Sequence, residues 1–110
     1  MRFMMTVNAG ASAPDEQMYA EMGKLIEELA RTGVLLATGG LDPGTHVTSS
    51  DGKITLTDGP FSESKELVGG YMIVQVRTLT EAVDAIRPWL RIHREGQGVE
   101  RTTIEVRRLL

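Results

Sequence analysis

The order of its periodic segments constrains the fold of this chain more than any other feature. A strand-like run, a segment with helical periodicity and a second strand-like run follow one another twice, over 2–8, 14–32 and 34–38 and then over 70–76, 78–90 and 103–109. Two such units with right-handed crossovers build one antiparallel sheet with both helices on one face. The sequence therefore predicts an α+β, ferredoxin-like fold, and its 110 residues fit a single domain, 1–110.

The first helix is expected over 14–32. Its apolar residues recur at helical spacing and form one stripe on an otherwise charged helix: Met18, Met22, Leu25, Ile26 and Leu29. We expect Ser12 to cap the start of this helix, and Gly33 is placed to end it in a left-handed conformation.

The second helix is expected to open at the capping box Thr78-Leu79-Thr80-Glu81. Pro88 should kink or end this helix, because proline has no backbone N–H to donate. Residues 91–101 are then expected to form a charged connector in which His93 is exposed to solvent.

An insertion separates the two units. Residues 45–48 and 53–57 read as short β segments, and Asp51-Gly52 between them is a strong signal for a tight turn. The sequence therefore predicts an inserted β-hairpin, which leads directly into the stretch 57–70, T-D-G-P-F-S-E-S-K-E-L-V-G-G.

The stretch 57–70 admits two interpretations. In the first it is a connecting loop, turned at Asp58-Gly59-Pro60 and held by Phe61 in the core. In the second it presents charged side chains into a pocket, since loops on rigid scaffolds often carry function. Under the second interpretation, the candidate ligand-binding residues are Asp42, Phe61, Glu63 and Lys65.

This stretch and the G-G-Y at its end resemble the signature of the DGPF group of the YCII-related family, and the order of elements is similar over nearly the whole chain. The resemblance implies a ferredoxin-like unit that dimerises into an α+β barrel. Some members resemble small lyases or dehydratases built around a His–Asp pair, with the histidine on the first helix. The segment 14–32 contains no histidine here, so that mechanism does not transfer directly. DGPF members also often occur beside extracytoplasmic-function sigma factors, so a regulatory protein is a second kind of partner to consider.

Both faces of several predicted strands are apolar, although the helices cover only one face. In the first strand, for example, Phe3 and Met5 alternate with Met4. Hiding apolar surface from water is worth roughly 25 cal/mol per Å², and a bare apolar sheet favours aggregation. We therefore expect a homodimer, with a second copy of the sheet as the cover and a pocket between each sheet and its neighbouring loops.

Three residues are candidates for proton chemistry: Asp58 as a base or orienting carboxylate, with His46 or Tyr71 as its partner. In the structural alternative, the D-x-x-x-H pattern formed by Asp42 and His46 is incidental. Tyr71 then buries its ring in the core and leaves its hydroxyl at the edge of the core. Two histidines without any cysteine give none of the short spacings of a zinc site, so we expect neither a metal nor a cofactor.

Two functions therefore stay open at this point. One is a non-catalytic dimeric module that binds a small molecule or a regulatory protein, and we favour it because each local feature already has a structural explanation. The other is a cofactor-free lyase or isomerase that uses Asp58 with His46 or Tyr71.

Composition limits the partners further. The net charge of −3 argues against a nucleic-acid binder, which needs a basic face. The chain has no cysteine, which fits a reducing cytoplasm. No run approaches the roughly twenty apolar residues of a membrane span, so we expect a cytoplasmic protein with no membrane contact.

Overall fold

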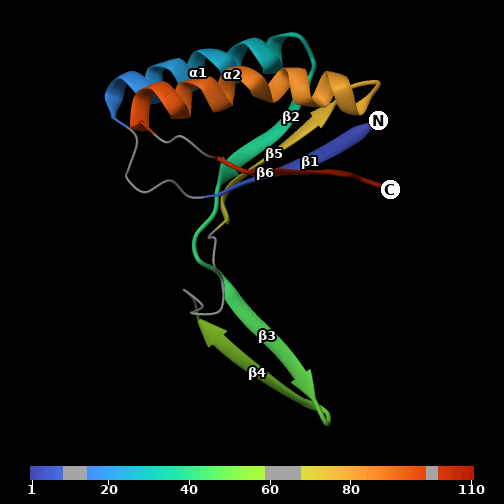
Figure 1. The fold of residues 1–110 in the computed structure, drawn as a ribbon. Coiled ribbons are helices and arrows are strands. Elements are labelled where there is room, and N and C mark those ends of the chain that lie inside the picture. Colours follow the sequence, from blue (N-terminus) through green and yellow to red (C-terminus); the bar gives the residue numbers. More distant parts are fainter. Residues whose placement is uncertain (9–14, 59–67, 99–101) are drawn as a thin grey trace.

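The computed structural model describes residues 1–8, 15–58, 68–98 and 102–110 (Figure 1). Its elements follow the chain in the order β1 (Arg2–Asn8), α1 (Glu16–Arg31), β2 (Leu35–Gly40), β3 (Thr45–Ser50), β4 (Lys53–Asp58), β5 (Val68–Gln75), α2 (Leu79–Gln97) and β6 (Ile104–Arg108). The two strand–helix–strand units are thus β1–α1–β2 and β5–α2–β6, and the strands β3 and β4 lie between them.

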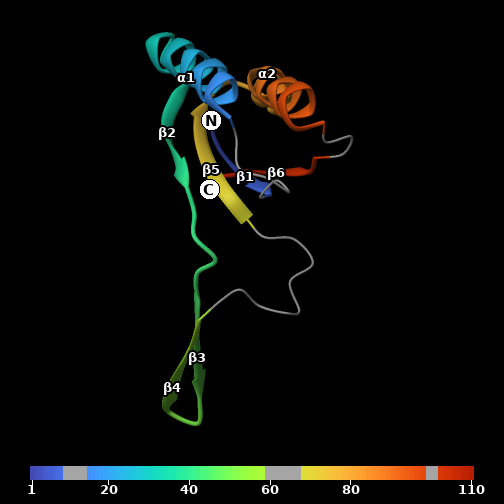
Figure 2. The same ribbon diagram turned by 90° about the vertical axis from the view of Figure 1, so that its left-hand side faces the viewer.

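The main sheet has four strands in the order β2-β5-β1-β6, and every pairing in it is antiparallel. Both helices lie side by side on one face of this sheet (Figures 1 and 2). This is the ferredoxin-like α+β arrangement that the repeated strand–helix–strand order predicts.

Alternation along the strands sorts the side chains between the two faces of the sheet. Phe3, Met5, Met72 and Val74 point toward the helices and are buried with Ala82 and Ile86 of α2. Successive strand residues point to opposite faces, so the residues between them point away from the helices. We call this second surface the helix-free face, and its residues on β1, β5 and β6 are Arg2, Met4, Thr6, Tyr71, Ile73, Gln75, Glu105 and Arg107.

Helix α1 is capped by Asp15, whose carboxylate accepts a hydrogen bond from the backbone N–H of Met18 at 2.8 Å. The predicted cap at Ser12 is therefore wrong, and Ser12 itself lies outside the described residues. Met18 and Met22 are buried on the apolar stripe, where they form a second cluster with Ile92 of α2. At the other end, Gly33 takes the predicted left-handed conformation, with φ 80°.

The start of helix α2 confirms the predicted capping box. The hydroxyl of Thr78 accepts a hydrogen bond from the backbone N–H of Glu81 at 3.1 Å. The Glu81 carboxylate in turn accepts the backbone N–H of Arg77 at 2.9 Å and pairs with the Arg77 guanidinium at 3.0 Å. The bond to Thr78 satisfies a backbone donor that a helix start otherwise leaves open, whereas the Glu81 carboxylate reaches the N–H of Arg77, one residue before the cap, in place of the Thr78 N–H.

Helix α2 does not end at Pro88 but continues to Gln97, so the predicted connector is wrong over 91–97, and residues 99–101 lie outside the described residues. Trp89 packs against both apolar clusters, and this burial outweighs the roughly 3 kcal/mol that an interior proline costs. The prediction of an exposed His93 is wrong for the same reason. Its ring is half-buried 4.9 Å from the Trp89 ring, and its Nδ1–H donates to the Trp89 carbonyl at 2.9 Å. No helix in the described ranges is long and apolar enough to cross a membrane.

Among the described residues, strands β3 and β4 pair only with each other and form a two-stranded hairpin, which we call the arm (Thr45–Asp58). Asp51 and Gly52 form its turn with φ 51° and 78°, the positive values that a type I′ turn requires. Every residue of the arm is exposed. The arm projects from the sheet on the side away from the helices (Figures 1 and 2).

Candidate functional site

Asp58 lies at the base of the arm, where it is paired with Thr45. Its Oδ1 accepts a hydrogen bond from the Thr45 hydroxyl at 2.8 Å. A hydrogen bond to an ionised carboxylate is stronger than one between neutral groups, so this contact helps to hold the two strand ends together. The predicted catalytic carboxylate therefore has a structural partner inside the arm.

Two other polar candidates, His46 and Asp42, belong to the arm and to the turn that precedes it. His46 is paired with Thr57, one position further along the arm than the Thr45–Asp58 pair. Because neighbouring residues of a strand point to opposite faces, His46 and Asp58 leave the arm on opposite faces. Asp42 precedes the arm, and its Oδ1 accepts the backbone N–H of Gly44 at 2.9 Å, as Asp commonly does in a turn.

Tyr71 lies on β5, between Thr6 of β1 and Gly39 of β2. A Cβ built on Gly39 would lie 3.1 Å from Cε1 and 3.4 Å from the hydroxyl of Tyr71, so the phenol ring lies across this glycine. Glycine in a strand often marks such a close approach. The strand was predicted over 34–38, but β2 runs from Leu35 to Gly40 and includes both glycines.

The helix-free face combines apolar and charged groups in two neighbouring cross-strand rows. The first row is Arg107, Met4, Ile73 and Ala37, and the second is Glu105, Thr6, Tyr71 and Gly39. At the β6 edge, the Arg107 guanidinium and the Glu105 carboxylate form an ion pair at 2.7 Å. This surface therefore offers apolar contact, a phenol hydroxyl and charges of both signs within one sheet.

Some candidate residues cannot be placed. Phe61, Glu63 and Lys65 lie outside the described residues, as does most of the stretch 57–70. Of the residues that are described, no three His, Cys, Asp or Glu side chains are grouped as metal ligands would be.

The sequence reasoning missed Arg107 and Glu105 as site residues. The alternation of both residues with Ile104 and Val106 on the last strand was the available signal in the sequence. Only the register of β6 on β1, which pairs Arg107 with Met4 and Glu105 with Thr6, places the ion pair beside the central strands.

Three comparisons set this chain beside known proteins. A family model described as the YCII-related domain matches residues 1–103. A similar solved structure is 5-chloro-2-hydroxyhydroquinone dehydrochlorinase (TftG) from Burkholderia phenoliruptrix, in complex with 2,5-dihydroxybenzoquinone. The similarity covers 100% of this chain and 94% of that chain, with 14% sequence identity and a TM-score of 0.47. A search of curated proteins found no match.

Proposed function

Because this chain belongs to the YCII-related domain family, over residues 1–103, we propose that it is a dimeric module that binds a small molecule on the helix-free face of its sheet. Within that family we place it in the DGPF group, on the strength of the T-D-G-P-F-S-E-S-K-E run. The dimer is an α+β barrel in which the two sheets face each other.

The chemistry of the helix-free face supports the dimer. Met4 and Ile73 lie at its centre on neighbouring strands, and both helices of the described part of the chain lie on the other face of the sheet (Figure 2). Burying apolar surface is favourable by roughly 25 cal/mol per Å², and a second sheet presents a surface of the same kind by symmetry. The phenol of Tyr71 and the Arg107–Glu105 ion pair then line the space between the sheets and offer polar contacts to a ligand.

The hydrogen bond between Asp58 and Thr45 is the observation that favours binding over catalysis. A general base must reach the proton that it abstracts, whereas this carboxylate already accepts a hydroxyl within the arm at 2.8 Å. In addition, the described residues include no buried polar or charged side chain. The described part of one chain therefore offers no water-excluded group of polar residues that could be poised for proton transfer.

The alternative is a cofactor-free lyase or isomerase with Asp58 as base and His46 or Tyr71 as its partner. Asp58 and His46 leave opposite faces of the arm, and Tyr71 lies on the sheet. This alternative therefore requires one of these partners to come from the second copy, or the arm to move when substrate binds.

Native mass spectrometry of the purified protein tests the proposal. We expect a dimer, twice the chain mass of 12.0 kDa, that retains a small molecule, which is then identified from the denatured protein. Tyr71→Phe should weaken binding of that molecule about five- to tenfold, the usual contribution of one hydrogen bond. Asp58→Asn should bind it as the wild type does.

Two other results would contradict the proposal. Conversion of the bound molecule by the wild type and loss of conversion in a folded Asp58→Asn variant would establish the enzyme instead. Unchanged binding in Tyr71→Phe and in Arg107→Gln would move the site away from the helix-free face.

A further inference from the structure

We propose that the arm is a clasp, which packs its apolar face against the second copy of this chain. This inference rests on the dimer of the proposed function and adds a contact that the facing sheets do not provide.

The two faces of the arm differ in chemistry. On one face the register pairs Val47 with Leu56, and Ser49 with Ile54. On the other face every pair is polar: His46 with Thr57, Thr48 with Thr55, and Ser50 with Lys53. If water surrounded both faces of the arm, nothing would favour the placement of its apolar residues on one face.

The apolar face is uncovered in the single chain. Val47, Ile54 and Leu56 are 65%, 70% and 66% exposed. An isolated two-stranded hairpin is at best marginally stable in water and needs a third strand or a packing partner. A cluster of exposed apolar side chains on such an element is typical of a protein contact.

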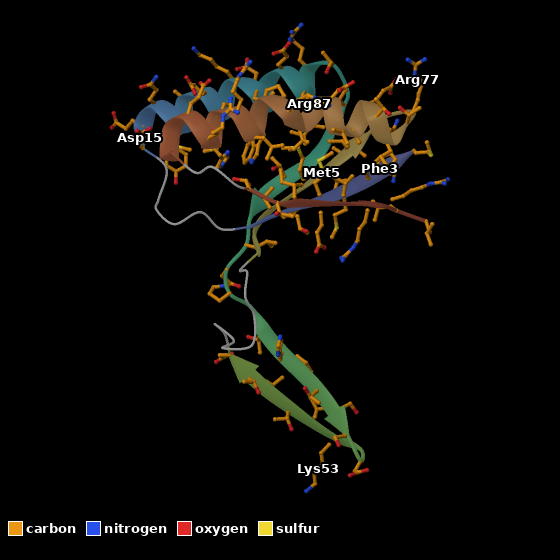
Figure 3. The ribbon with its side chains drawn as sticks, viewed as in Figure 1. Phe3, Met5, Asp15, Lys53, Arg77 and Arg87 are labelled. Atoms are coloured by element: carbon orange, nitrogen blue, oxygen red, sulfur yellow. The ribbon has the colours of Figure 1, made fainter. Side chains whose placement is uncertain are left out.

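The position of the arm identifies its partner as a second copy. Lys53 marks its far end, well beyond the sheet and on the side opposite the helices, whereas Phe3 and Met5 lie between the sheet and the helices (Figure 3). Stacked sheets lie about 10 Å apart, and six strand residues span about 20 Å. The arm therefore reaches past the layer in which a second sheet would lie, and any body that covers the helix-free face lies beside the arm.

The ionisable residues of the arm are placed in a way that permits an apolar contact on one face. Asp58, at the base of the arm, is the only ionisable residue among the pairs on the apolar face, and the Thr45 hydroxyl already engages it. Lys53 belongs to the opposite face. In a twofold dimer the contact is made twice, because each arm packs on the other subunit.

A dilution series followed by sedimentation velocity tests this inference. The variant Val47→Thr/Ile54→Thr/Leu56→Thr keeps residues that favour strands but makes the apolar face polar. Its dimer dissociation constant should rise by at least about tenfold. The control Thr48→Ser/Thr55→Ser changes the polar face and should stay within about twofold of the wild type. Trp89 fluorescence should be unchanged in both variants and reports that the body is folded.

A second readout keeps the test decisive if the triple variant unfolds the arm. The chain has no cysteine, so an environment-sensitive dye can be attached to Ile54→Cys alone. Its emission should shift to the blue as the protein concentration passes the dissociation constant, while the same dye on Thr55→Cys should not shift.

Two results would overturn the inference. The first leaves the dimer of facing sheets in place, and the second removes that dimer as well. A wild-type dimer with no shift at Ile54→Cys and an unweakened triple variant refutes the clasp and leaves the facing sheets intact. A wild type that stays monomeric at every concentration removes the dimer and the clasp together.

Discussion

Gly96 of α2 lies against the Met18 side chain of α1 and gives a sharp test of the packing between the helices. A Cβ at Gly96 would overlap Cγ and Sδ of Met18 and would lie 3.2 Å from its Cε. Met18 is only 2% exposed in the cluster that joins α1 to α2, so it has little room to move. The substitution Gly96→Ala therefore forces a side chain into a packed interior.

Two opposing contributions set the change in the free energy of unfolding that Gly96→Ala causes. Overpacking a core costs about 1–3 kcal/mol, while alanine in place of glycine favours a helix by up to about 1 kcal/mol. We expect Gly96→Ala to lower the free energy of unfolding by about 1 kcal/mol. Gly23 on α1 is the matched control, because a Cβ there meets nothing within 4 Å. Gly23→Ala should therefore raise the free energy of unfolding by about 1 kcal/mol.

Urea unfolding at one fixed protein concentration measures both variants, with the single tryptophan as the probe. In a Met18→Ala background the obstruction is gone, so Gly96→Ala should become stabilising. This change of sign is specific to the contact. If Gly96→Ala stabilises the intact protein as much as Gly23→Ala does, the helices do not approach as closely as we describe.

Three further predictions concern the sheet and the helix starts. Gly39→Ala should displace the Tyr71 ring, shift its NMR resonances and lower the free energy of unfolding by about 1 kcal/mol. The control is Gly40→Ala, because a Cβ there would lie 3.9 Å from the nearest atom, and it should leave the Tyr71 resonances in place. Asp15→Ala and Thr78→Ala should each lower the free energy of unfolding by about 1 kcal/mol, and unchanged urea midpoints would refute the caps. The hydrogen bond from the Arg77 backbone N–H, helped by the Arg77 side chain, lowers the pKa of Glu81 below its ordinary value of 4.5. The stabilisation by Glu81 is therefore complete above pH 4.5 and is lost as the pH falls through the lowered pKa, so urea midpoints of wild type and Glu81→Gln should converge at low pH.

Local signals predicted much of the fold. The capping box at Thr78 and the turn at Asp51-Gly52 each depend on a few neighbouring residues, and both form as expected. The pattern of apolar residues likewise located the strands and helices, because burial on one face imposes the period of each element. The order of the two strand–helix–strand units then determined the class of the sheet.

The sequence-based predictions failed mainly where contacts between residues far apart in the sequence determine the structure. The break at Pro88 was expected from the local cost of a proline, but Trp89 packs against both clusters and Ile92 belongs to the second, and these contacts carry the helix past it. At α1 the cap is Asp15 and not the predicted Ser12. The partnership of Asp58 with His46 stays a prediction, and strand alternation directs the two side chains to opposite faces of the arm. The Tyr71–Gly39 contact depends on strand register, which the sequence did not specify.

The most direct test is the accessibility of the helix-free face in solution. Thr6→Cys places a single thiol on that face, and Thr48→Cys places one on the polar face of the arm as a control. If a second copy covers the sheet, thiol labelling at Thr6→Cys should slow by at least about tenfold as the protein concentration rises through the dimer dissociation constant, while labelling at Thr48→Cys stays constant. Equal labelling rates for Thr6→Cys at low and high protein concentration would contradict the account.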